Sequence, residues 1–354
     1  MTYPLGGKEF FNQEMRELTI LYITEPGVKA GIQDNQFVII TKDNLKRSIP
    51  IEKLESVVAI SKCTLSSSCL CKLLSQGIPV TYISSKGLFY GRLESTKHVN
   101  IVRQRKQFRC GENKEFCINI AKKIISTKIH NQIIILKRNA KNNSDLLCQI
   151  QPDLERMAES EHKITNSSDI DQILGFEGIA SRAYYKVLSL FIDPVYDFKG
   201  RNRMPPQDPV NSLLSFGYTL LLYEIYTVLS SKGLNPYAGF IHKDRHGHPS
   251  LASDLIEEWR AVIVDSLVLK LIKAYKFTIE DFQKEPETGG VYLDKKTSRQ
   301  FIQEFENRLK TEAGYGANIG TGSNFRRLIQ HQAGLICSAI DNENPDLFIP
   351  LKIR

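Results

Sequence analysis

The sequence predicts an α+β fold, with a small N-terminal β-rich domain followed by a larger all-α domain. Residues 18–93 contain short apolar or alternating runs that are rich in Ile, Val and Tyr and separated by glycines, which is typical of strands. From residue 101 to about residue 341 the apolar residues recur at helical spacing instead. We therefore expect domains at 1–93 and 101–354, joined by a linker at 94–100.

The predicted β-rich domain contains one helical insert. SSSCLCKLLSQG begins with serines suited to an N-cap, carries leucines on one side and ends at Gly77. The runs expected to form strands are LTILYI, QFVII, SVVAI, PVTYIS and GLFYGRL.

Five segments of the second domain are expected to be helical, because their apolar residues are periodic and Ser, Asp or Gly mark their ends. Residues 198–210, FKGRNRMPPQDPV, hold three prolines and three basic residues and are expected to form a mobile loop. The helices are expected at 101–142, 167–191, 211–233, 250–275 and 323–340.

Composition favours a cytoplasmic protein without a membrane span. No run of about 18 uninterrupted apolar residues is present, and the N-terminus lacks the basic start and apolar core of a signal peptide. The seven cysteines are odd in number and irregular in spacing, as expected of free thiols in a reducing compartment.

Positive charge is concentrated in one segment. Residues 101–150 contain eleven Lys and Arg against three Asp and Glu, a surplus of eight that equals the net charge of the whole chain. Such a stripe favours a polyanion partner, because each neutralised phosphate releases counterions. A solvated helix face is the other interpretation that the charge alone leaves open.

The stretch GFIHKDRHGHPSLASDLIEEWR, residues 239–260, combines histidines with acids. Gly247 and Pro249 interrupt it, so its three histidines do not share one helix. At about 100° per residue, four acids of a 250–275 helix would form one stripe. That stripe is either solvated surface or part of a metal site, and its members are Asp254, Glu257, Glu258 and Asp265.

A second acid has an unusual setting. Glu177 lies between Gly175 and Gly178 in an otherwise apolar helix, LGFEGIA. Each glycine costs about 1 kcal/mol relative to alanine, which is reasonable where a neighbouring helix or a substrate approaches closely. A buried glutamate needs a partner or a cation, and Glu, His and a second acid suit Mn²⁺ or Mg²⁺.

Several longer sequence motifs resemble those of one family. LGFEGIASRAYY, DPVNSLLSFGYTLLLYE, GLNPYAGFIHKDRHGHPSLASDLIEEWRAVIVD and FRRLIQHQA occur in the order and spacing of the CRISPR-associated Cas1 endonucleases, the integrases of spacer acquisition. The resemblance covers most of residues 170–335, and the β-then-α layout matches over the full chain.

The resemblance implies a set of site residues. The metal ligands and catalytic residues would be Glu177, His242 and Glu257, with Asp254 either assisting the metal or orienting a ligand. Asn211 and Tyr218 would line the site, although simple core packing also explains Tyr218. His246 and His248 have no implied role and are expected to be solvent-facing. Residues expected to contact DNA are Arg103, Arg105, Lys106, Arg109, Arg201, Arg203, Lys243 and Arg245.

The implied function is insertion of spacer DNA into a CRISPR array. A DNA 3′-OH would attack a phosphodiester in a transesterification that requires Mg²⁺ or Mn²⁺, and water in place of the 3′-OH would give a nuclease. The implied partners are protospacer and repeat DNA, a second copy of the chain bound through the β-rich domain, and the small Cas2 protein.

Two alternatives remain open from the sequence. One is a structure-specific DNA repair nuclease that uses the same three ligands. The other is a nucleic-acid-binding scaffold in which those residues are structural and no chemistry occurs.

Overall fold

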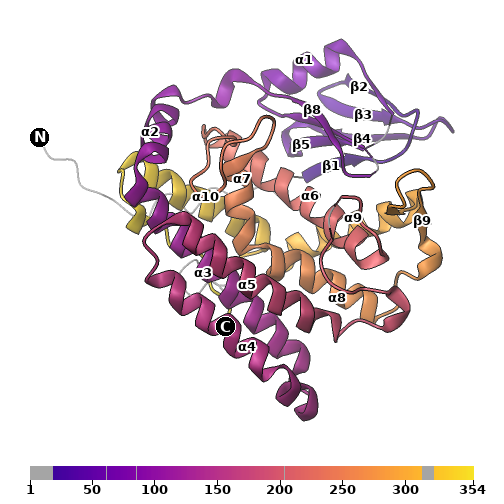
Figure 1. The fold of residues 1–354 in the computed structure, drawn as a ribbon. Coiled ribbons are helices and arrows are strands. Elements are labelled where there is room, and N and C mark those ends of the chain that lie inside the picture. The colour runs from indigo at the N-terminus through magenta and orange to yellow at the C-terminus, as the bar shows by residue number, and fades with distance from the viewer. Residues whose placement is uncertain (1–18, 61, 85, 203, 313–322) are drawn as a thin grey trace, which may run out of the picture. The chain divides into compact units, whose positions relative to one another are not determined.

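The chain divides into two compact units, residues 1–97 and 98–354 (Figure 1). The computed structural model describes residues 19–354 except 61, 85, 203 and 313–322. A strand-rich region followed by a helical domain confirms the predicted fold class. The division falls inside the segment 94–100, where the sequence pattern changes from period two to helical spacing.

The strand-rich unit contains two four-stranded sheets. In the first, ordered β1-β5-β7-β8, the first three strands are parallel and β8 is antiparallel. In the second, ordered β4-β3-β2-β6, only the β2–β6 pair is parallel. The strands are β1 (Thr19–Ile23), β2 (Lys29–Gln33), β3 (Gln36–Ile40), β4 (Lys46–Pro50), β5 (Leu54–Ala59), β6 (Thr64–Leu65), β7 (Val80–Ile83) and β8 (Phe89–Leu93).

One apolar core serves both sheets and the helix α1 (Ser67–Ser75). Phe37 of β3, Val57 of β5, Leu73 of α1 and Val80 of β7 are completely buried in it. All five expected strands and the helical insert are present. The additional strands β2, β4 and β6 have too few apolar residues to be separated from turns by pattern alone.

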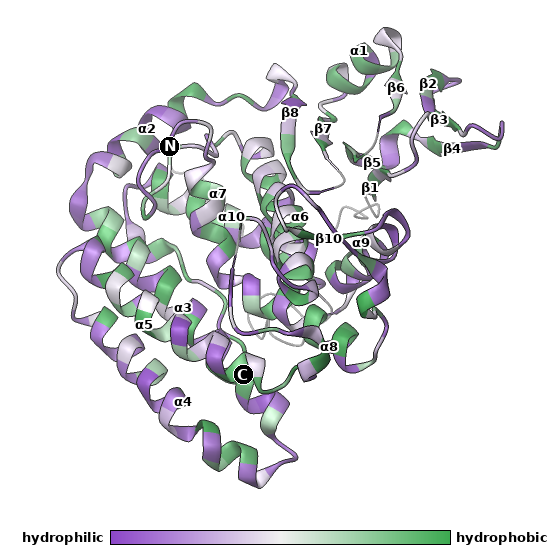
Figure 2. Ribbon diagram, turned by 45° about the vertical axis from the view of Figure 1, so that its right-hand side comes forward, coloured by the Kyte–Doolittle hydropathy of each residue, from purple (hydrophilic) through white to green (hydrophobic). Residues whose placement is uncertain are grey.

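The helical unit is built mainly from the helices α2 to α10 and one β-hairpin. Its first three long helices, α3, α4 and α5, lie side by side (Figure 1), and hydrophilic and hydrophobic residues alternate around α4, which has one buried side (Figure 2). The elements are α2 (Ile101–Glu112), α3 (Lys114–Ala140), α4 (Ser144–Thr165), α5 (Ile170–Ser189), α6 (Pro209–Ser231), α7 (Ser250–Leu255), α8 (Ser266–Lys273), α9 (Lys295–Lys310), α10 (Phe325–Asp341) and the hairpin β9 (Phe282–Lys284) with β10 (Val291–Leu293).

Three expectations for this unit are corrected. The basic helix expected at 101–142 is broken at Asn113, whose side chain accepts a hydrogen bond from the Phe116 N–H and caps α3. The β9–β10 hairpin means that the second domain is not all-α. The helix expected at 250–275 is interrupted by a 3₁₀ turn, Ile256–Glu258, and a π-helical segment, Arg260–Asp265.

Helix α6 forms the centre of the helical unit. It is the helix among the described residues that is long and apolar enough to cross a membrane, yet 78% of its most apolar window is buried inside the protein. Its apolar character therefore has a sufficient explanation in core packing. All seven cysteines are free thiols.

Candidate active site

Glu177 projects from the middle of α5 and is partly exposed. Its Oε1 accepts a hydrogen bond from Ser181 Oγ, one turn later, at 2.7 Å, and a second from the ammonium group of Lys128 on α3. A Cβ built on Gly175 or Gly178 would meet no atom within 4 Å. The two glycines therefore make no room for another described segment of this chain, which leaves a substrate as the remaining explanation from sequence.

Glu257 lies in the 3₁₀ turn that follows α7. The local change from 3₁₀ to π geometry rotates the side chains away from the positions that a regular helix would give them. Asp254, Glu257, Glu258 and Asp265 are all buried, and each meets different partners. The interpretation of these acids as a solvated surface stripe is therefore wrong.

Lys128 joins the two candidate carboxylates. Its Nζ pairs with Glu177 Oε1 and lies 2.7 Å from Glu257 Oε2, while Arg260 Nη1 lies 3.0 Å from Glu257 Oε1. Burial opposes ionisation of Glu257, but Arg260 and Lys128 together lower its pKa to about 2. Burial likewise opposes ionisation of Glu177, and the charge of Lys128 keeps its pKa below the usual value.

Asp254 orients His242. Its Oδ2 accepts hydrogen bonds from the backbone N–H of Phe240 at 2.6 Å and of Ile241 at 3.0 Å. Its Oδ1 lies 3.1 Å from the His242 backbone nitrogen and 2.6 Å from His242 Nδ1. Both carboxylate oxygens are thus engaged within the protein, so the geometry favours the orienting role over metal ligation.

Two consequences follow for the His242 ring. The hydrogen bond to Asp254 raises the pKa of His242 against the effect of burial, and the nearby charge of Glu257 acts in the same direction. With Nδ1 held by the carboxylate, Nε2 is the nitrogen available to a metal ion. Gly239 is required at this bend, because a Cβ there would lie 2.7 Å from Asp254 Oδ2.

Tyr218 belongs to a network beside this cluster. Its hydroxyl donates to Asp265 Oδ1 at 2.5 Å, and Tyr184 donates to Asp265 Oδ2 at 2.7 Å. The guanidinium groups of Arg260 and Arg201 lie 5.0 Å and 5.4 Å from the centroid of the Tyr218 ring. Tyr218 is therefore both packed in the core and in contact with Arg260, the residue that pairs with Glu257.

Asn211 fixes the loop that precedes α6. Its Oδ1 accepts from Arg201 Nη1 at 2.8 Å and from the Asn202 N–H at 3.1 Å. Its Nδ2 donates to the Gly200 carbonyl at 2.8 Å and to Asp208 Oδ2 at 2.6 Å. Hydrogen bonds hold the loop that the sequence predicted to be mobile, and Asn211 has a structural task there.

The side chains at this site are of the types that bind a divalent cation. Two carboxylates converge on one cation, the Lys128 ammonium, and Glu257 Oε2 is buried without a hydrogen bond from any described residue. Carboxylate and imidazole donors suit Mg²⁺ or Mn²⁺. Within the described ranges, however, no three His, Cys, Asp or Glu side chains already surround a common point. Lys128 stands between the two acids instead.

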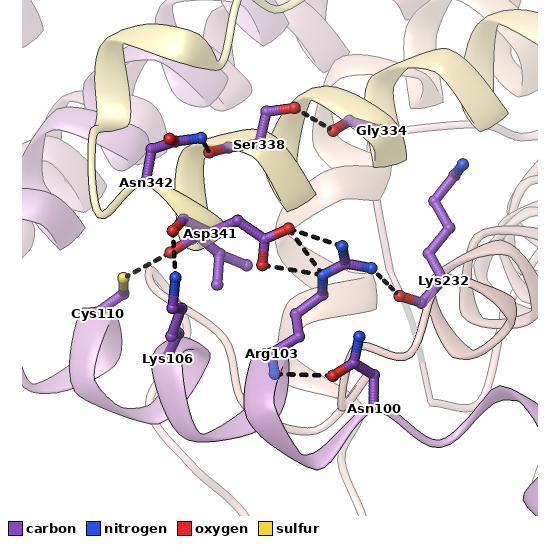
Figure 3. Close-up of polar contacts among 10 residues, drawn as sticks. Asn100, Arg103, Lys106, Cys110, Lys232, Gly334, Ser338, Asp341 and Asn342 are labelled. Atoms are coloured by element: carbon purple, nitrogen blue, oxygen red, sulfur yellow. Dashed lines mark hydrogen bonds and ion pairs between the residues drawn. The ribbon is translucent and has the colours of Figure 1, made fainter. Parts of the chain in front are cut away.

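The basic residues expected to contact DNA differ in how they are used. Arg103 donates to Asp341 from Nε and Nη2 and to the Lys232 carbonyl from Nη1, and Lys106 donates to the Asp341 carbonyl (Figure 3). These two side chains tie α2 to α10. Arg105 and Arg109 lie on the exposed side of α2, where Arg109 Nη2 lies 3.9 Å from Glu343 in a long ion pair.

The other expected contacts fall into three groups. Arg201 is committed to the loop network, and Arg203 lies outside the described residues. Lys243 and Arg245 are exposed beside His242, with Lys243 Nζ 3.7 Å from Asp171. His246 is exposed as expected, but His248 is half-buried, with its ring centroid 6.2 Å from that of His242.

Sequence reasoning missed Lys128 and Arg260. A signal for Lys128 was present, because Ile120, Ile124 and Lys128 occupy one row of α3 at a spacing of four, and both isoleucines are completely buried. A lysine that continues a buried row needs an anionic partner. A weaker signal marked Arg260, which lies three residues after Glu257 at the spacing of a helical acid–base pair.

Solved structures define the class of fold. A Cas1 protein from Thermotoga maritima superposes with a TM-score of 0.77 at 21% identity over 91% of this chain and 97% of that one. A casposase bound to its integration product gives 0.78 at 23% identity over 92% of each chain. A Cas6-RT-Cas1–Cas2 complex gives 0.83 at 24% identity over 98% of this chain, which spans 38% of that longer chain. The fold is that of Cas1 and casposase structures.

Sequence comparison gives the family. The model described as CRISPR associated protein Cas1 matches residues 21–307. A CRISPR-associated endonuclease Cas1 from Chlorobaculum tepidum is 30% identical over 96% of this chain and 99% of its own length. Another, from Mycobacterium tuberculosis, is 27% identical over 94% and 97%. The chain belongs to the Cas1 family, and the resemblance drawn from its sequence words is confirmed.

Proposed function

We propose that this protein is a divalent-metal-dependent DNA endonuclease and integrase that inserts spacer DNA into a CRISPR array. Its curated relatives are named endonucleases, and one similar structure is a casposase with an integration product. The observation that carries the proposal is the pair of the half-buried Glu177 and the buried Glu257, converging on a single cation beside an oriented histidine.

Each residue has a role in this proposal. Glu177, Glu257 and His242 Nε2 would hold Mg²⁺ or Mn²⁺, and Asp254 would keep the imidazole in the required orientation. The bound metal would polarise the scissile phosphate and stabilise charge on the departing oxygen. Arg260 holds Glu257 ionised, and Lys243 and Arg245 are exposed next to His242, where they could contact the DNA backbone.

The reaction is a transesterification. The oxygen of a DNA 3′-OH forms a new bond to the phosphorus of a target phosphodiester, the bond to the target 3′ oxygen breaks, and a proton passes from attacker to leaving group through solvent. The number of phosphodiester bonds is unchanged, so no ATP is needed. Water as the attacker would give hydrolysis and shorter strands at the same site.

We further propose that the protein works as a homodimer with Cas2 and DNA in the cytoplasm. Similar structures include Cas1–Cas2 complexes, the free thiols suit a reducing compartment, and the strand-rich unit offers apolar side chains such as Leu88 and Tyr90 that are exposed in the single chain. That unit is the proposed dimer contact.

A strand-joining assay tests the proposal. Purified protein is incubated with a labelled duplex that has free 3′ ends and a repeat-containing plasmid, in Mg²⁺, Mn²⁺ or chelator. We expect branched joined products with metal only, and a loss of about 1,000-fold for Glu177→Gln, His242→Ala and Glu257→Gln, equivalent to about 4 kcal/mol of transition-state stabilisation. Glu159→Gln, which alters an exposed pair with Lys163 on α4, is the matched control.

The products separate the alternatives. Shorter strands without joined products would indicate a repair-type nuclease instead of an integrase. Activity that survives in all three site variants and in chelator would refute the metal site and favour the scaffold or a different centre.

A further inference from the structure

Lys128 is a buried lysine at the centre of the candidate site. Its side chain is 8% exposed, and it continues the buried row of α3 that contains Ile120 and Ile124. A charged ammonium group in such a place is expensive unless it is paired. Its two partners are Glu177 and Glu257, so the sequence places a cation where the two proposed metal ligands meet.

The charges around this point are balanced without a metal ion. Glu177 and Glu257 supply two negative charges, and Lys128 and Arg260 supply two positive charges. Arg260 lies against Glu257 Oε1, whereas Lys128 lies against Oε2. A divalent ion that binds both acids would therefore need the space and the oxygen that Lys128 occupies.

The contacts of Lys128 with the two acids can be replaced by contacts with a metal ion. Its approach to Glu257 Oε2 is close, at 2.7 Å, but it is an ion pair without a well-directed hydrogen bond. Ser181 donates to the same Glu177 oxygen as Lys128, so that oxygen keeps a partner when the ammonium leaves.

We propose that Lys128 is a built-in counter-cation: it holds Glu177 and Glu257 together in the metal-free protein and competes with the divalent ion for their oxygens. This inference rests on the proposed metal site and adds a role that is separate from metal ligation. Without Lys128 the cluster would carry an excess negative charge. The two carboxylates would then repel each other in the apo protein and attract a cation more strongly. The lysine thus lowers metal affinity and raises apo stability.

Titration calorimetry with MnCl₂ on the full-length chain tests this role. Lys128→Met removes the charge and keeps the side-chain length, and we expect it to bind Mn²⁺ about tenfold more tightly than wild type. Lys128→Arg keeps the charge and can form two parallel hydrogen bonds, so it should bind Mn²⁺ more weakly than wild type. Lys186→Met is the matched control, because Lys186 pairs with the buried Asp153 at 2.8 Å, nine residues beyond Glu177 on α5. It should bind Mn²⁺ as wild type does.

Thermal unfolding gives an independent readout. In chelator, Lys128→Met should melt at a lower temperature than wild type, and saturating Mn²⁺ should raise its Tm by more than it raises that of wild type. If Lys128→Met does not fold without metal, Lys128→Arg still decides: unchanged or tighter Mn²⁺ binding by it would overturn the inference. So would Mn²⁺ binding by folded Lys128→Met that is equal to or weaker than wild type.

Failure of the inference is distinguishable from failure of the proposed function. Glu177→Gln removes a proposed ligand and should abolish the Mn²⁺ isotherm. If it does not, the metal site itself is refuted. If it does, while Lys128→Met binds no more tightly than wild type, the metal site stands and the counter-cation role falls.

Discussion

Two clusters of buried charge lie in the helical unit, and they differ in how completely their oxygens are hydrogen-bonded. In the first, Arg326 of α10 donates to all four carboxylate oxygens of Glu224 on α6 and Glu306 on α9, at 2.6 to 3.3 Å. In the second, at the candidate site, Glu257 Oε2 is buried without a hydrogen bond from any residue in the described ranges. All four carboxylate oxygens of the first cluster are hydrogen-bonded, whereas Glu257 Oε2 in the second is held by the Lys128 ion pair at 2.7 Å.

The ratio of acids to bases differs as well. One arginine serves two acids around Arg326, and burial raises the pKa of Glu224. At the candidate site two bases serve two acids, and the pKa of Glu257 falls to about 2. A site that must present ionised oxygens to a cation benefits from having one base for each acid, whereas a purely structural cluster can tolerate a weaker acid.

The largest expected effect concerns the cluster around Arg326. Arg326→Met would leave two buried carboxylates without their partner, which lowers the free energy of unfolding by about 3–5 kcal/mol. Denaturant unfolding measures it, and strand joining per folded molecule should be retained below the transition. A stability loss under about 1 kcal/mol would show that the two clusters differ less than their hydrogen bonding indicates.

A third buried acid, Asp265, makes hydrogen bonds but no ion pair with the residues that the structure describes, and it predicts a pH effect. Burial raises the pKa of Asp265 to about 6, although Tyr218 and Tyr184 donate to it. Between about pH 4 and pH 6 the folded state binds the proton that the unfolded state has released, so stability falls as pH rises. Above the folded pKa the penalty stays constant, at about 3 kcal/mol for a shift of about two units.

Asp265→Asn removes this titration. Relative to the variant, wild type should lose about 3 kcal/mol of unfolding free energy between pH 4 and pH 7, measured by urea unfolding at each pH. Parallel profiles for the two proteins would mean that Asp265 ionises normally. The tyrosine network beside Arg260 would then be as well paired as the cluster around Arg326.

The sequence predicted the two-part architecture and the motifs that hold the candidate site residues, but not the contacts that hold the site together. The five strands and the main helices follow from local periodicity and capping, which the chain carries in each segment. Lys128 is 49 residues from Glu177 and more than one hundred from Glu257, so their meeting depends on helix packing. The π-helical segment at Arg260–Asp265 has no local signature, and it separates Asp265 from the other three acids, so regular 100° geometry does not hold for Asp265.

Asp254 illustrates the same limit at shorter range. The family resemblance leaves Asp254 as either a metal ligand or an orienting residue. The three backbone N–H groups at its carboxylate distinguish these two roles. Asp254→Asn should weaken Mn²⁺ binding about 10–100-fold in titration calorimetry, because residues that orient a ligand histidine contribute on that scale. Asp153→Asn, a buried acid paired with Lys186, is the matched control and should leave the isotherm unchanged. Complete loss of binding would instead make Asp254 a ligand.

The smallest expected effect distinguishes the two sides of α2. Arg105 and Arg109 are exposed, whereas Arg103 donates hydrogen bonds to Asp341 and to the Lys232 carbonyl (Figure 3). If the exposed side contacts DNA phosphates, the double variant Arg105→Gln, Arg109→Gln should reduce the slope of log K against log salt concentration by about 1.8, with no change in Tm. Arg103→Gln should lower Tm and leave the slope unchanged, because its charge already has a partner inside the protein. A slope that changes in Arg103→Gln alone would reverse the assignment, since it would mean that the α2–α10 ion pair opens when DNA binds.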